Sequence, residues 1–124
     1  MYTGRRILVV EDEPLIAMLV GDWLVELQCE VAGTVNSVPA AMQVADREAL
    51  HAALLDVNLG GENSYSLADK LIAAKVPIAF ITGRDSSSLP ERFRQAPVLC
   101  KPFDFSAIER LLAGMLAPAG EPSV

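Results

Sequence analysis

The sequence predicts an α/β protein built as a three-layer sandwich of five βα units. Short apolar runs of strand length alternate with segments in which apolar residues recur at helical spacing. This alternation continues along the 124-residue chain, without an internal repeat or a second pattern. Strands that alternate with helices form a parallel sheet, and right-handed crossovers then place helices on both of its faces.

The first half of the chain supplies two strands and two helices. Arg6–Val10 is apolar after its first residue, which favours a buried strand. Pro14 suits the first turn of a helix, and apolar residues recur at helical spacing from there to Leu27. Glu30–Thr34 is a weaker apolar run and predicts the second strand. The second helix runs to Asp46 and has two candidate N-caps, Asn36 and Ser37.

The middle of the chain continues the pattern. Ala52–Val57 is the third strand, because it is again almost wholly apolar. The polar loop Asn58–Ser64 contains two adjacent glycines, so we expect a mobile turn. Ser66–Ala74 is the third helix, with Leu67, Leu71 and Ile72 on its apolar side. Pro77–Ile81 is the fourth strand.

The last part of the chain contains the weakest helix. Pro90 interrupts Ser86–Ala96, so the fourth helix is expected to be short or disordered. Val98–Cys100 is the fifth strand. A final amphipathic helix follows, with its start at one of two residues, Asp104 or Ser106.

The domain organisation follows from these elements. Residues 1–4 form a lead-in, 5–116 one domain, and 117–124 a flexible tail rich in Pro and Gly. The longest apolar run is far shorter than a membrane span, so a cytoplasmic protein is expected. The net charge of −6 argues against direct nucleic-acid binding, which needs a basic surface.

Acidic residues follow the two central strands of this sheet. A flavodoxin-like strand order, 2-1-3-4-5, is the common solution at this size, and its ligands bind where the first and third strands end. Glu11 and Asp12 follow the first strand, and Asp56 lies at the end of the third. Two carboxylates at about 4 Å repel each other by about 4 kcal/mol at an effective dielectric constant of about 20. A hard cation removes this repulsion.

The pattern therefore predicts a Mg²⁺ (or Mn²⁺) site. Mg²⁺ binds through one or two carboxylates and keeps positions for water and phosphate. Asp12 and Asp56 are the expected direct ligands, and Glu11 is expected to act through water. The backbone carbonyl of Asn58 is a further candidate ligand.

The same strand ends carry groups suited to phosphoryl transfer. A carboxylate can attack phosphorus, and Asp56 is the best-placed candidate. Thr82 follows the fourth strand and offers a hydroxyl, and Lys101 follows the fifth and offers an ammonium group. Each residue alone is typical of a turn, a cap or a solvated loop. Together, in this order, they indicate stabilisation of a phosphoryl group.

These residues resemble the receiver domains (CheY-like superfamily) of two-component signalling. The matching motifs are Ile7–Glu13, Leu54–Asn58, Thr82 and Lys101-Pro102-Phe103. The resemblance implies that a sensor histidine kinase or a histidine phosphotransfer protein donates a phosphoryl group to Asp56. It also implies that the domain catalyses its own phosphorylation and dephosphorylation, without being an enzyme for separate substrates. A cis Lys101–Pro102 peptide is a further implication.

Without an output domain, such a protein acts through protein–protein contacts with a downstream partner or as a phosphate sink, as a monomer or weak dimer. Val98 occupies the position where receivers often carry an aromatic switch residue. That departure and the motif Phe-Ile-Thr-Gly-Arg, which ends in Gly83 and Arg84, resemble the single-domain "FATGUY" receivers. We therefore expect phosphorylation to order the segment Thr82–Phe93 in place of an aromatic flip. Arg84 could contact the phosphoryl group or be a solvated loop residue.

Two other functions remain open at this point. One is a phosphorylation-independent interaction module on the same fold, which a missing acceptor or lysine would favour; neither is missing. The other is an aspartate-based phosphatase with separate substrates. Such enzymes usually place a general acid two residues after the nucleophile, where this sequence has Asn58.

Overall fold

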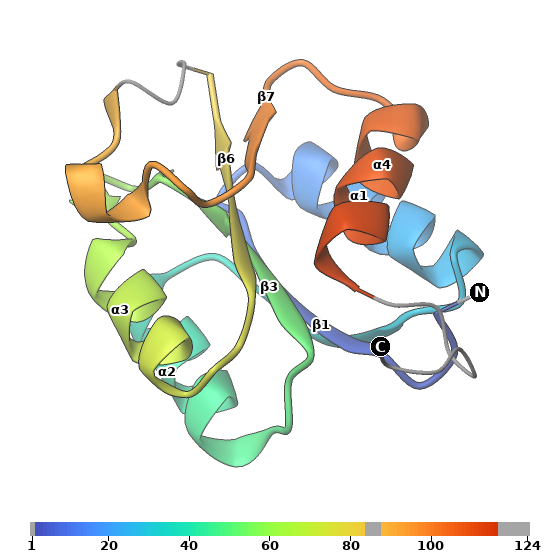
Figure 1. The fold of residues 1–124 in the computed structure, drawn as a ribbon, viewed down its shortest axis with the longest axis horizontal. Helices are drawn as coiled ribbons and strands as arrows, with labels where there is room; N and C mark the ends of the chain where they lie inside the picture. Colours follow the sequence, from blue (N-terminus) through green and yellow to red (C-terminus); the bar gives the residue numbers. More distant parts are fainter. Residues whose placement is uncertain (1, 84–87, 117–124) are drawn as a thin grey trace.

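The computed structural model describes residues 2–83 and 88–116, and it contains the expected central sheet (Figure 1). The parallel strands lie in the order β2-β1-β3-β6-β7. Their bounds are Arg6–Val10 for β1, Glu30–Val35 for β2, Ala52–Asp56 for β3, Ile78–Thr82 for β6 and Val98–Cys100 for β7. Since β4 and β5 pair separately, this is the predicted order 2-1-3-4-5.

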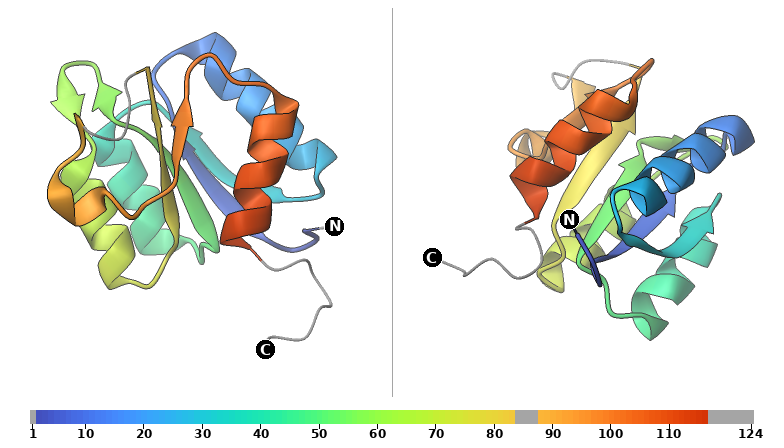
Figure 2. Two further views of the ribbon diagram at one scale, coloured as in Figure 1. Left: turned by 45° about the horizontal axis from the view of Figure 1, so that its top comes forward. Right: turned by 90° about the vertical axis from the view of Figure 1, so that its right-hand side faces the viewer.

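Helices cover both faces of the sheet, which confirms the three-layer prediction (Figure 2). α1 and α4 lie on one face, and α2 and α3 lie on the other (Figure 1). Their bounds are Pro14–Glu26 for α1, Val38–Arg47 for α2, Tyr65–Ala73 for α3 and Phe105–Met115 for α4. The N-caps Ser37 and Asp104 each accept a hydrogen bond from an amide of the first turn.

The central strands are buried on both faces, and their side chains divide between two cores. In β1, Ile7 and Val9 pack toward α1 and α4, while Leu8 and Val10 pack toward α2 and α3. All four are fully buried. Burying one such side chain contributes about 1.5–3 kcal/mol. This two-sided burial explains why the strands read as continuous apolar runs rather than alternating ones.

The apolar spacing overstated burial at three helical positions. Leu15 and Leu19 belong to the apolar residues that recur at helical spacing between Pro14 and Leu27, and Ile72 to the apolar side of the third helix, but their exposed fractions are 64%, 37% and 48%. In α1 the sheet side is formed by Ala17, Val20 and Leu24. This helix is apolar around much of its circumference, so spacing alone does not show which side faces the sheet.

The loop after β3, where the sequence predicts a mobile turn, forms a β-hairpin. β4 (Asn58–Leu59) and β5 (Glu62–Asn63) pair antiparallel across Gly60 and Gly61. Both glycines have positive φ, +61° and +90°. Two-residue hairpins of this kind need positive φ at both central positions, which glycine adopts without strain. Leu59 anchors the hairpin in the core on the α2–α3 side of the sheet.

The described part of the segment between β6 and β7 lacks the fourth helix, which the sequence predicts to be short or disordered. Residues 88–97 contain no α-helix, and a 3-10 helix lies at Glu91–Phe93. Leu89 and Phe93 are nevertheless buried, and Phe93 packs against Tyr65 and Phe80 at ring-centroid distances of 5.5 and 5.2 Å. The described end of Thr82–Phe93 is therefore packed on the core in this structure, and its ordering on phosphorylation stays a prediction. Arg84 and the tail 117–124 lie outside the described residues.

The lead-in is packed against the domain from its second residue. Tyr2 is buried against the core between the sheet and helices α1 and α4, and its amide donates a hydrogen bond to the carbonyl of Leu27. Within residues 2–83 and 88–116, no helix is both long and apolar enough to cross a membrane.

Candidate functional site

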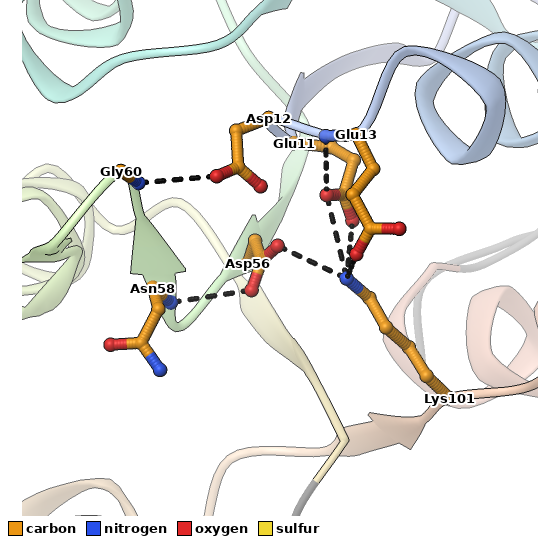
Figure 3. Close-up of polar contacts among 7 residues, drawn as sticks. All are labelled: Glu11, Asp12, Glu13, Asp56, Asn58, Gly60 and Lys101. Atoms are coloured by element: carbon orange, nitrogen blue, oxygen red, sulfur yellow. Dashed lines mark hydrogen bonds and ion pairs between the residues drawn. The ribbon is translucent and has the colours of Figure 1, made fainter.

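The carboxyl ends of the strands bring the predicted site residues to one edge of the sheet (Figure 3). Glu11 and Asp12 directly follow β1, and Asp56 is the last residue of β3. The register pairs Asp56 with Ile81, so Thr82 ends β6 one residue beyond this level. Lys101 follows β7, and its amide donates to the carbonyl of Thr82 at 2.8 Å. Parallel pairing alone therefore gathers residues that are far apart in the sequence.

Three carboxylates form a cluster that fits a divalent cation. Glu11, Asp12 and Asp56 each offer an oxygen, and these oxygens all lie within 4.8 Å of one another. Glu11 and Asp56 are buried, whereas Asp12 is exposed. Oε1 of Glu11 is buried and makes no hydrogen bond, although Lys101 Nζ lies 3.1 Å away as an ion-pair partner. An oxygen-rich site with excess negative charge is what Mg²⁺ binds, so the donor set fits this ion.

The β4–β5 hairpin orients two of the three acids. The amide of Asn58 donates to Oδ1 of Asp56 at 3.2 Å, and the amide of Gly60 donates to Oδ2 of Asp12 at 3.1 Å (Figure 3). The second hydrogen bond joins the hairpin turn to the end of β1, so the backbone at Gly60 must lie close to Asp12. The hairpin thus holds two carboxylates in place and positions Asn58, the candidate carbonyl ligand, beside the acceptor.

Lys101 compensates part of the negative charge. Its Nζ atom lies 3.1 Å from Oδ2 of Asp56, 3.1 Å from Oε1 of Glu11 and 3.0 Å from Oε1 of Glu13. The lysine side chain is only 18% exposed. The peptide between Lys101 and Pro102 is cis, as the resemblance implied.

The charge cluster shifts two pKa values. Burial, together with a hydrogen bond shared with Asp56, raises the pKa of Glu11 from its ordinary 4.5 to about 7. Burial lowers the pKa of Lys101, but hydrogen bonds to Glu13, Glu11 and Asp56 outweigh it and the net pKa is raised. Lys101 therefore carries its charge at any physiological pH, whereas Glu11 is poised near neutrality in the absence of a metal ion.

Glu13 is the site residue that sequence reasoning missed. Glu13 ends the motif Ile7–Glu13 and has no predicted role there, yet its carboxylate makes the 3.0 Å contact with Lys101. The run of three acids after β1 was the available signal. The sequence could not show that the third acid turns toward the end of β7.

The remaining predicted positions lie on β6 and β7 or directly after β6. Thr82 is buried at the end of β6, and Gly83 follows it. Val98 pairs with Phe80 and packs against the core on the α2–α3 side of the sheet, where Phe93 supplies a buried aromatic ring. An aromatic ring thus packs against Phe80, the β6 residue paired with Val98, but it comes from the 3-10 segment.

The fold and this arrangement of acids and lysine define a class, and comparison with known proteins agrees. The family model described as the response regulator receiver domain matches residues 7–113. The chain therefore belongs to the response regulator receiver domains.

One curated relative matches most of the chain. The chain is 29% identical over 106 residues to the transcriptional regulatory protein PdtaR of Mycobacterium tuberculosis; the match covers 82% of this chain and 52% of that protein. The chain thus spans about half the length of this curated relative.

Two solved structures of one protein, SdrG, are more similar in sequence. SdrG from Sphingomonas melonis Fr1 is 43% identical, with a TM-score of 0.82 over 94% of this chain and 100% of that one. A BeF3-activated conformation of SdrG matches with a TM-score of 0.80. The receiver domain of the sensor histidine kinase PA1611 from Pseudomonas aeruginosa, solved with magnesium in its active-site cleft, is 26% identical, with a TM-score of 0.73 over 91% of this chain and 98% of that one.

Proposed function

We propose that this protein is a phosphoacceptor of a two-component phosphorelay, with Asp56 as the residue that is phosphorylated. The observation that carries the proposal is the contact between Lys101 Nζ and Asp56 Oδ2 at 3.1 Å, inside a cluster of three carboxylates. A lysine this close to the acceptor can bind a phosphoryl oxygen as negative charge moves onto it. The magnesium in the cleft of the PA1611 receiver supports the same reading.

The chemistry follows from the positions of the groups. A histidine kinase or histidine phosphotransfer protein brings a phosphohistidine to the edge of the sheet. An oxygen of Asp56 forms a bond to phosphorus while the phosphorus–nitrogen bond breaks, and the electron pair of that bond stays on the imidazole. Lys101 and the hydroxyl of Thr82 bind phosphoryl oxygens. Attack by water on phosphorus later releases inorganic phosphate and restores the carboxylate.

Mg²⁺ would be held by Asp12 and Asp56, with Glu11 acting through water and the carbonyl of Asn58 as a further ligand. Bound there, the ion supplies positive charge that neutralises the transferred group. We further propose that the output is a phosphorylation-dependent contact with another protein or removal of phosphate from a kinase. Cytoplasmic location and membership of the FATGUY group belong to this proposal.

The test is phosphorylation by a small-molecule donor. The protein is incubated with phosphoramidate and Mg²⁺, and its intact mass is followed beside that of Asp56→Asn. The proposal predicts a gain of one phosphoryl group that needs Mg²⁺ and is absent in the variant. An unchanged mass, with no transfer from any histidine kinase tested either, would favour the phosphorylation-independent interaction module.

A further inference from the structure

The third acid after β1, Glu13, has a contact that neither the metal site nor the helix explains. Glu13 is the N-cap residue of α1, but its side chain makes no capping hydrogen bond. Its carboxylate instead accepts a hydrogen bond from Lys101 Nζ at 3.0 Å. N-cap side chains normally accept hydrogen bonds from amides of the first helical turn. The Glu13 carboxylate does not, so it is free of the helix and available to Lys101.

Lys101 has no donor to spare for a newly attached group. An ammonium group has three N–H donors, and among the described residues they are directed at Glu11, Glu13 and Asp56. Of these three acceptors, Glu13 alone lies outside the cluster that can hold a metal ion. A phosphoryl group on Asp56 requires a donor from Lys101. Glu13 is the acceptor that competes for that donor without contributing to the metal site.

The exposures of the three carboxylates show which contact yields most easily. The Glu13 side chain is 59% exposed, whereas those of Glu11 and Asp56 are 0% and 9% exposed. An ion pair open to water is weak, because the solvent screens it and can replace either partner. Figure 3 shows Nζ between Asp56 on one side and Glu11 and Glu13 on the other. A move toward a phosphoryl oxygen would therefore break the Glu13 contact first.

We propose that Glu13 is a positioning residue that draws Lys101 away from the phosphoryl group and so weakens the phosphorylated state. The inference rests on the function proposed above and adds a residue that regulates the stability of the phosphorylated state. The ion pair holds Lys101 when Asp56 is unmodified, and its loss is part of the cost of binding a phosphoryl group. Glu13 thereby sets how readily Asp56 remains phosphorylated.

The chain contains a natural reporter of this exchange. Glu13 and Lys101 line an apolar cavity of about 430 Å³ whose walls include Trp23 and Phe103. Trp23 is the single tryptophan of the chain. Movement of Lys101 away from Glu13 changes the polar wall of this cavity and should alter the fluorescence of Trp23.

The experiment measures the affinity for beryllium trifluoride, a phosphoryl mimic, at saturating Mg²⁺. Wild type, Glu13→Gln and Glu62→Gln are titrated with beryllium in excess fluoride and followed by Trp23 fluorescence. Glu62 is a matched control, since it is an exposed acid on the nearby hairpin and has no contact with Lys101 among the described residues. Glu13→Gln should bind about two- to fivefold more tightly, the strength of a partly exposed ion pair, and Glu62→Gln should match wild type.

A double-mutant cycle separates the contact from the charge. In a Lys101→Met background the reporter is lost with the lysine, so beryllium binding to all cycle variants is measured by calorimetry, over a wider beryllium range for those that lack Lys101. There Glu13→Gln should no longer change the affinity. Equal affinity of wild type and Glu13→Gln overturns the inference. The same tightening in Glu62→Gln, or in the Lys101→Met background, also overturns it, because the effect is then one of general charge. No binding by the wild-type protein removes the proposed function itself.

Discussion

Lys101 Nζ and Asp56 Oδ2 lie 3.1 Å apart although 45 positions separate the two residues in the sequence. The contact depends on three strand ends at once, because β3, β6 and β7 must pair in parallel and end at the same level. It places a charged lysine against a buried carboxylate in the unmodified protein. The site is therefore arranged for an added anion before any phosphoryl group arrives.

Removal of the lysine should destabilise the metal-free protein. Lys101→Met keeps most of the side-chain volume but leaves Glu11 and Asp56 without their cation. We expect urea unfolding at pH 8 to show a loss of about 1–3 kcal/mol in the free energy of unfolding. Lys70→Met is the matched control, since Lys70 pairs with Asp46 in an exposed ion pair. Its effect should stay below about 0.5 kcal/mol; equal losses in both variants would contradict the account.

Removal of one acid should have the opposite effect on the metal-free protein. Asp12→Asn removes a charge from the carboxylate cluster but retains an oxygen that can accept from Gly60. Its free energy of unfolding without Mg²⁺ should rise by about 0.5–1.5 kcal/mol, because like-charge repulsion is relieved. Mg²⁺ that binds only the folded state raises the free energy of unfolding. Added Mg²⁺ should therefore stabilise wild type and not the variant, which has lost a ligand. Thermal melts with and without Mg²⁺ test both parts, and an equal Mg²⁺ response would contradict the ligand assignment.

Mg²⁺ affinity should depend on pH through Glu11. Its pKa is raised to about 7, so below that pH the carboxyl of the metal-free protein is largely protonated. Since the ion favours the ionised form, affinity should rise by about tenfold between pH 6 and 8 and then level off. The metal-free protein should behave oppositely. It holds a proton that the unfolded chain has lost between pH 4.5 and about 7, so its free energy of unfolding falls as pH rises through that window.

The control for this pH dependence is Glu11→Gln, which cannot ionise. Calorimetric titration of Mg²⁺ at several pH values should give a flatter profile for the variant than for wild type. An equally steep profile in both proteins would assign the dependence to another group.

The hairpin turn should matter for both stability and metal binding. Gly61 has φ of +90°, so Gly61→Ala places a side chain in a strained conformation and should cost about 1 kcal/mol. It should also weaken Mg²⁺ binding, because the neighbouring Gly60 amide holds Asp12. Gly114→Ala is the control: this glycine lies inside α4 with open space around an added Cβ, and the change should stabilise by about 0.4–1 kcal/mol. Unchanged Mg²⁺ affinity in Gly61→Ala would show that the hairpin turn does not contribute to metal binding.

Sequence reasoning predicted the sheet and the main site because both depend on local signals. Apolar runs identify the strands, and a parallel order brings Glu11, Asp56 and Lys101 together without knowledge of any contact. The hairpin was also within reach, since two adjacent glycines between short segments favour a two-residue turn. The contact of Glu13 with Lys101 was not, because it depends on how α1 is oriented relative to the end of β7. The exposure of Leu15 and Leu19 depends on the same orientation.

The most direct test of the central claim is to locate the covalent bond on the chain. Protein treated with phosphoramidate and Mg²⁺ is reduced with borohydride, which converts an aspartyl phosphate to homoserine, and its peptides are then sequenced by mass spectrometry. The account predicts homoserine at position 56 and nowhere else, and none when Mg²⁺ is omitted. Homoserine at another acid, or a stable phosphoryl group on a residue other than Asp56, would contradict it.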